Sequence, residues 1–195
     1  DIWHHRPMNM PDTASAGTLN IIVQTTSWDA TAGVLFIGTS RYDCTLGRGG
    51  VTLDKVEGDG KTPVGTYPLR QLIYRADRMT QPETGLPVEV LTADTGWCED
   101  PAHPDYNKKV TLPHPAVCDR MTRDDHLYDM TVVIGYNDDP PAAGKGSAIF
   151  MHLAREELTP TAGCVGLRRD DLISVLRLLS PDSHITILPP PDSPY

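Results

Sequence analysis

The sequence lacks the features that several large classes of protein require. Its formal net charge is −9 and its pI is near 5.1, so it has no excess of basic residues to neutralise nucleic-acid phosphates. No run of residues is apolar for long enough to cross a bilayer, and the first residues lack the apolar core of a signal peptide. We therefore expect no nucleic-acid partner and no membrane span, and the missing initiating Met suggests a processed or trimmed chain.

The sequence also lacks a nucleotide-binding motif. The stretch Gly58-Asp59-Gly60-Lys61-Thr62 ends like a phosphate-binding loop. However, Lys55 stands where the first glycine is required, and Pro63 would interrupt the helix that must follow. The residues therefore predict a tight turn that leads into a strand at Thr66–Ile73.

Few cysteines are present, and their number limits how they pair. The four are Cys44, Cys98, Cys118 and Cys164. If Cys164 is a free nucleophile, complete pairing is impossible. Cys98 and Cys118 bracket a Pro-rich insertion and form the preferred pair. A zinc site that adds His103 and His114 is the alternative, although a tight pair of cysteines is missing.

Short alternating apolar stretches dominate the rest of the chain, and 195 residues are most simply one domain. We expect a mobile tail at 1–17, a catalytic domain at 18–189 and a tail at 190–195. One helix is predicted after Asp170, its expected N-cap, because Leu172, Ile173, Leu176 and Leu179 stand at helical spacing. The irregular region 80–118 is expected to be a binding loop or lid. Strands are expected at 19–24, 34–38, 41–46, 66–73, 88–91, 109–112, 130–135, 148–153, 165–167 and 184–188. The fold class is therefore mainly β with one or a few short helices.

A histidine and a cysteine joined by a short loop are the strongest candidates for chemistry. His152 ends an apolar run, and Gly163 directly precedes Cys164. A thiol attacks a carbonyl as its thiolate, so a neighbouring imidazole that lowers its pKa would activate it. The N–H groups of Gly163 and Cys164 would bind the oxyanion. A buried structural cysteine and a core histidine are the alternative reading of this spacing.

Two motifs resemble the L,D-transpeptidase (YkuD-type) family. One is His152 followed by Gly163-Cys164-Val165, and the other is the segment from Glu57 to Leu69 with its Gly-Asp-Gly-Lys-Thr-Pro-Val-Gly-Thr-Tyr-Pro-Leu order. The resemblance extends from about Thr18 to Leu188. Ala162 and Gly166 replace polar residues of the usual motif, which places the chain in a divergent branch.

The resemblance implies a YkuD-like mixed β-sandwich and a cysteine acyltransferase of the periplasm or cell envelope. Cys164 would attack a peptidoglycan stem peptide and release terminal D-Ala, with His152 as the base. An acceptor amine would then form the crosslink, without metal or cofactor, in a monomeric enzyme that carbapenems acylate. An L,D-carboxypeptidase and a non-catalytic wall-binding module are the alternatives.

Several polar and aromatic residues are candidates for binding substrate. Arg168 and Arg169 follow the motif directly and would attract a stem carboxylate. Tyr136 and Asn137 end a predicted strand, and Trp97 could pack on sugar or peptide, although anchoring of the loop is favoured for it. Thr161 is the sixth candidate and would alternatively orient His152. Arg123–Asp129 is expected to be a solvated charged segment.

Overall fold

The computed structural model describes residues 17–191, so residues 1–16 and 192–195 of the expected tails lie outside the described residues. The described part contains a single helix, α1, at Arg169–Leu178. Its strands are β1 (Ile21–Gln24), β2 (Ala32–Ile37), β3 (Ser40–Thr45), β4 (Val51–Thr52), β5 (Thr62–Pro63), β6 (Gly65–Tyr74), β7 (Val88–Val90), β8 (Thr95–Cys98), β9 (Lys109–Thr111), β10 (Cys118–Arg120), β11 (Met130–Ile134), β12 (Phe150–Leu153), β13 (Val165–Leu167) and β14 (His184–Ile187).

One nine-stranded sheet forms the body of the molecule, in the order β11-β12-β13-β3-β2-β1-β14-β6-β7. The long strand β6 pairs with β14 through Gly65–Pro68 and with β11 through Leu69–Tyr74. Because β11 also pairs with β12 at the start of the order, the sheet closes on itself like a barrel. The mainly β fold predicted from the sequence is confirmed.

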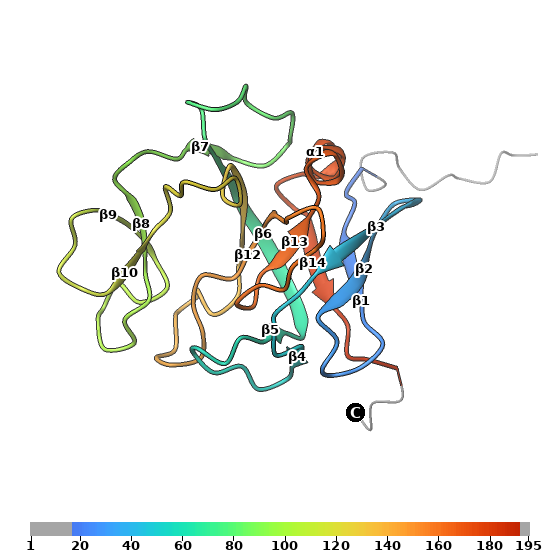
Figure 1. Cartoon of the computed structure of the whole chain (residues 1–195), viewed down its shortest axis with the longest axis horizontal. Helices are drawn as coiled ribbons and strands as arrows, with labels where there is room; N and C mark the ends of the chain where they lie inside the picture. The colour runs from blue at the N-terminus through green and yellow to red at the C-terminus, as the bar shows by residue number, and fades with distance from the viewer. Residues whose placement is uncertain (1–16, 192–195) are drawn as a thin grey trace, which may run out of the picture.

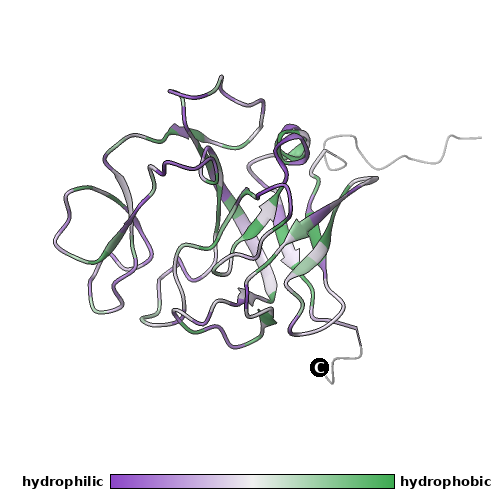
Figure 2. Ribbon diagram, viewed as in Figure 1, coloured by the Kyte–Doolittle hydropathy of each residue, from purple (hydrophilic) through white to green (hydrophobic). Residues whose placement is uncertain are grey.

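The core follows the alternation of the strands. In β1, Ile21 and Val23 are fully buried and Ile22 is exposed, as expected for a strand with one face in the core. All residues of β11, β12 and β13 are buried. Hydrophobic colour is accordingly concentrated on the sheet, while the outer loops are more hydrophilic (Figure 2). The site strands β12 and β13 are therefore held on both faces.

Helix α1 covers the sheet beside β12. Leu172, Val175 and Leu176 form its buried stripe, at the spacing of one helix face. The predicted N-cap was wrong: Arg168 occupies this position without a side-chain cap, and Asp170 lies in the first turn, where a carboxylate favours the helix dipole. No helix in the described part of the chain has the length and apolar character needed to cross a membrane.

The region predicted to be an irregular lid contains its own small sheet, in the order β10-β8-β9. This sheet lies on the side of the molecule opposite β1–β3 (Figure 1). Cys98 of β8 is fully buried, and so is Met121, which follows β10. Strand β9 corresponds to the strand predicted at 109–112, whereas β8 and β10 were missed because each is only three or four residues long.

Candidate active site

Adjacent strands bring the predicted nucleophile and base to one place. Strands β12 and β13 are parallel, with Met151 opposite Val165 and His152 opposite Gly166. Cys164 directly precedes β13, so it lies opposite Phe150 of β12. His152 is two residues further along β12. Cys164 and His152 line the same cavity, whose volume is about 300 Å³. The structure therefore places both residues at one cavity, and their roles as nucleophile and base stay a prediction.

The Cys164 side chain is almost completely enclosed, with 6% of its surface exposed. Its Sγ accepts a hydrogen bond from the Phe150 N–H and donates to the Ala148 carbonyl, each at 3.3 Å. Burial raises the pKa of the Cys164 thiol to about 12. The expectation of a lowered thiol pKa is thus wrong for the resting site, which holds a thiol until a base removes its proton.

The His152 ring has a defined orientation. Its Nδ1 lies 2.7 Å from the Leu153 carbonyl, so Nδ1 carries the hydrogen and Nε2 keeps its lone pair. Tyr128 packs edge-on against the ring, with 5.3 Å between the ring centroids. Burial lowers the pKa of His152 to about 4, so the imidazole is neutral at pH 7. The group that orients His152 is therefore the Leu153 carbonyl, whereas the Thr161 hydroxyl bonds to Cys164 and Gly163.

Gly163 has a conformational role in addition to the oxyanion role predicted for its N–H. Its φ of 136° lies where side chains are rarely accommodated, and a Cβ there would lie 2.8 Å from the Lys61 carbonyl oxygen. Its N–H donates to Thr161 Oγ1 at 3.1 Å, and the Thr161 hydroxyl donates to the Cys164 carbonyl at 2.7 Å. The Gly163 N–H is thus occupied, whereas within residues 17–191 the Cys164 N–H has no acceptor.

The second motif lies directly against the loop that precedes Cys164. Thr161 donates its N–H to the Leu46 carbonyl at 2.9 Å and accepts from the Arg48 N–H at 2.8 Å. The neighbouring Gly47 N–H donates to Thr62 Oγ1 at 2.9 Å. The two sequence motifs that are far apart in the chain therefore form one continuous support for the site.

Three arginines line the cavity: Arg48, Arg123 and Arg155. Arg123 holds Asp125 with two hydrogen bonds of 2.9 and 2.8 Å, and Arg155 lies 3.6 Å from the same carboxylate. Arg48 forms no ion pair among the described residues. The cavity wall is therefore locally cationic in a protein that is acidic overall.

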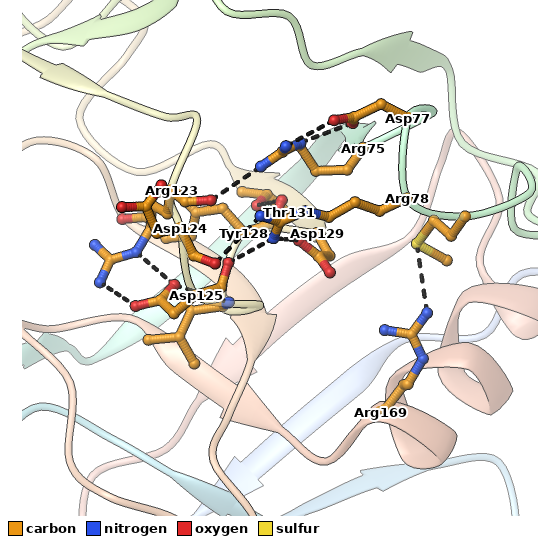
Figure 3. Close-up of polar contacts among 12 residues, drawn as sticks. Arg75, Asp77, Arg78, Arg123, Asp124, Asp125, Tyr128, Asp129, Thr131 and Arg169 are labelled. Atoms are coloured by element: carbon orange, nitrogen blue, oxygen red, sulfur yellow. Dashed lines mark hydrogen bonds and ion pairs between the residues drawn. The ribbon is translucent and has the colours of Figure 1, made fainter.

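The arginines of the turn after β6 fix the segment that supplies Arg123 and Tyr128 (Figure 3). Arg75 donates to the Arg123 carbonyl at 3.0 Å, and Arg78 donates to the Asp129 carboxylate at 3.0 Å. The Arg123 guanidinium in turn lies 5.2 Å from the centroid of the Tyr128 ring. The expectation of a merely solvated segment at Arg123–Asp129 was wrong, because its backbone carbonyls are bound by buried or half-buried arginines.

Of the six residues predicted to bind substrate, Thr161 lines the cavity and the others lie outside its wall. Arg168 contacts the Glu156 carbonyl at 3.1 Å, and Arg169 contacts Met79 Sδ at 3.9 Å. The Tyr136 hydroxyl donates to the Lys145 carbonyl at 2.5 Å, and Asn137 Nδ2 donates to the Gly146 carbonyl at 2.9 Å.

The small sheet β10-β8-β9 and its loops, residues 95–120, are called the insertion from here on. Trp97 anchors this insertion to the site, as the favoured reading of the sequence expected. It is 6% exposed, and its ring packs edge-on against Phe150 with 4.9 Å between centroids. Asn107, which sequence reasoning missed, joins them: its Oδ1 accepts from Trp97 Nε1 at 2.9 Å and from the Ala148 N–H at 3.0 Å. Its only sequence signal is an asparagine in a turn, and its φ of 57° agrees with the preference of that residue.

Comparison with known families gives one match. Residues 31–187 match the model of the L,D-transpeptidase catalytic domain, YkuD. The chain belongs to this family. Comparisons with curated proteins and with solved structures gave no match.

Membership of this family indicates the general activity of the domain. The family consists of cysteine-dependent acyltransferases that act on peptidoglycan stem peptides. The cavity with a thiol, a neutral imidazole and cationic side chains has the groups that such chemistry requires.

Proposed function

We propose that this domain is a peptidoglycan L,D-transpeptidase in which Cys164 is the nucleophile and His152 the general base. The supporting observation is that both side chains line one cavity, with the Nδ1 hydrogen of His152 bound to Leu153 and its Nε2 lone pair free to accept a proton. We further propose that residues 18–189 form the catalytic domain and act in the periplasm or cell envelope.

Acylation begins when the stem-peptide carbonyl enters the cavity beside Cys164. The thiol proton passes to His152 Nε2 as the sulfur attacks the carbonyl carbon of the third residue. The C–N bond to terminal D-Ala then breaks, and the imidazolium returns the proton to the leaving amine. The Phe150 N–H, 3.3 Å from Sγ, stabilises the developing thiolate that burial disfavours.

Two further groups are assigned to substrate. The Cys164 N–H is the oxyanion donor, because the Gly163 N–H is bound to Thr161. Arg48 binds a carboxylate of the stem peptide, because it lines the cavity without an ion pair among the described residues. A substrate contact by Arg168, Arg169, Tyr136, Asn137 or Trp97 stays a prediction.

The thioester is resolved by an amine or by water. Attack by an acceptor amine forms the crosslink, and the thiol regains its proton. Attack by water yields a shortened stem, which is the L,D-carboxypeptidase reaction. Both use the same acyl-enzyme, so product composition separates them.

Incubation of the purified protein with stem tetrapeptides, followed by mass spectrometry of the products, tests the proposal. A crosslinked dimer with release of D-Ala is expected. A shortened stem alone would replace the transferase with a carboxypeptidase. Exposure to a carbapenem should add the drug mass to the peptide that contains Cys164. Binding to peptidoglycan without any product or adduct would establish a non-catalytic wall-binding module.

A further inference from the structure

A second group of cysteine and histidine side chains lies in the insertion, away from the cavity. Cys98 on β8 stands directly opposite Cys118 on the antiparallel strand β10. The neighbouring pairs carry the backbone hydrogen bonds, from Glu99 N–H to the Val117 carbonyl and from Met121 N–H to the Thr95 carbonyl. The two cysteines therefore form a non-hydrogen-bonded pair, whose Cα atoms lie about 4.5 Å apart in such ladders.

That geometry suits a disulfide. Bridged cysteines have Cα separations of about 4.4–6.8 Å. As directly opposed residues of the ladder, Cys98 and Cys118 place their side chains on the same face of the small sheet. Cys98 is fully buried and Cys118 is half-buried, so an external reagent meets Cys118 first.

A base is placed beside Cys118. His114 Nδ1 lies 3.4 Å from Cys118 Sγ, and His114 Nε2 lies 2.9 Å from Asp105 Oδ2. Because Nδ1 also accepts the Ala116 N–H at 3.1 Å, the ring hydrogen is on Nε2 and is donated to Asp105. The single lone pair of Nδ1 is thus shared between the Ala116 N–H and the Cys118 thiol, and Asp105 holds the ring in this orientation.

The same hydrogen bonds argue against a metal at this place. His103, Asp105 and His114 have potential ligand atoms within 4.8 Å of one another. His103 Nδ1 accepts the Asp105 N–H at 2.9 Å, just as His114 Nδ1 accepts a backbone N–H. Neutral rings in this state carry hydrogen on Nε2, the atom that would have to bind the ion.

We propose that Cys98 and Cys118 form a disulfide by exchange with an external disulfide. His114 takes the Cys118 proton, and the thiolate attacks one sulfur of the reagent and releases one thiolate. Cys98 then loses its proton and attacks the Cys118 sulfur, releasing the second. Two protein thiols are oxidised and the reagent is reduced to two thiols.

This disulfide would connect the insertion to the site through only a few intervening residues. Trp97 directly precedes Cys98 and packs against Phe150, whose N–H donates to Cys164 Sγ. Asn107, within the loop that the disulfide closes, holds the Ala148 N–H. The disulfide is thus placed to stabilise the backbone around Cys164 while leaving its thiol free.

Peptide mapping tests the proposal on the full chain. The protein is oxidised with glutathione disulfide, alkylated after denaturation and digested with trypsin, which cuts at Lys108 and Lys109 between the two cysteines. We expect joined peptides containing Cys98 and Cys118, with Cys44 and Cys164 alkylated separately. Reduction should lower the melting temperature by roughly 5–10 °C.

Single substitutions test formation of the disulfide and proton removal by His114 separately. Cys118→Ser should abolish the joined peptide and the effect of reduction on the melting temperature, while Cys44→Ala should retain both. His114→Gln should slow bond formation about tenfold or more, with the exposed His184→Gln as its control. Separate alkylation of Cys98 and Cys118 after oxidation would overturn the proposal. So would one zinc ion per chain that shields both thiols. Neither result depends on transpeptidase activity.

Discussion

Two regions of the molecule each place a histidine beside a cysteine, and their surroundings give them different chemistry. At the sheet, Cys164 and His152 are buried and face a cavity of about 300 Å³. In the insertion, Cys118 is half-buried and faces Cys98 as well as His114. A cavity admits an electrophile from a substrate, whereas an opposed thiol provides a partner within the protein. The same residue types are thus distinguished by what lies in front of the sulfur.

The two regions also differ in the group that orients the histidine. His152 is oriented by a backbone carbonyl at 2.7 Å, and His114 by the Asp105 carboxylate at 2.9 Å. Burial is what keeps the His152 imidazole uncharged, because the hydrogen bond to the Leu153 carbonyl acts in the opposite direction on its pKa. The sheet site therefore stores a neutral thiol and imidazole until substrate arrives.

Removal of the Cys164 sulfur is the sharpest way to break the comparison. Cys164→Ala should lower stem-peptide turnover by on the order of 10³-fold or more, since no other group in the cavity replaces the nucleophile. Circular dichroism should show an unchanged fold, and Cys44→Ala serves as the control for loss of a buried thiol. Turnover retained by Cys164→Ala would refute the mechanism.

Removal of the base gives the next largest effect. His152→Gln should lower turnover by about 10²–10⁴-fold, because Nε2 accepts the thiol proton. His114→Gln should leave turnover nearly unchanged. Equal losses in the two variants would show that the two regions do not have separate roles.

The stability of the protein should depend on pH through His152. Its folded pKa of about 4 lies below the ordinary 6.5, so between these values the unfolded chain binds a proton that the folded chain does not. Stability conferred by the neutral ring is complete above pH 6.5 and is lost as the pH falls toward 4, at up to about 1.4 kcal/mol per pH unit. Urea unfolding at several pH values measures this slope. His152→Gln should flatten it, and a slope equal to wild type would contradict the assignment.

Charge removal in the cavity wall should have a smaller effect. Arg48→Gln should raise KM for the donor stem about tenfold, because one charge-assisted hydrogen bond to a carboxylate is lost. Arg177→Gln, on the exposed part of α1, removes the same charge far from the substrate and should leave KM unchanged. An unchanged KM in Arg48→Gln would move carboxylate binding to another residue.

The smallest effect is expected at the insertion. Cys118→Ser should change turnover at 25 °C by less than about twofold, because Cys118 does not line the cavity. Inactivation on heating, measured as residual turnover, should be faster in this variant after oxidation. Loss of turnover at 25 °C would show that the insertion has a direct part in the reaction.

Sequence reasoning worked best where one local pattern decides the result. The alternation in β1, the helix predicted on Leu172, Ile173, Leu176 and Leu179, and the mainly β fold class are of this kind. It was less successful for β8 and β10, which pair through residues 20 to 24 positions apart, and for the N-cap at Arg168. Short strands gain their stability from a partner that a local window does not contain.

The residues of the candidate site fall into two similar groups. His152, Gly163 and Cys164 were named as candidates from residue type and order, but Arg48, Arg123 and Asn107 were not. Arg48 reaches the site because its backbone is bonded to Thr161, and Arg123 because Arg75 holds its carbonyl. Such hydrogen bonds join segments that carry no signal of each other.

By itself the sequence determined the β-rich fold and the family resemblance, and it named the thiol and imidazole that are the candidates for catalysis. Tertiary structure decided that the resting thiol is protonated, that Leu153 orients His152, and that the cavity is lined by arginines other than those next to Cys164. The reason is physical. Burial and hydrogen-bond partners set pKa values and ring orientations, and both depend on chain segments that meet only when the sheet closes.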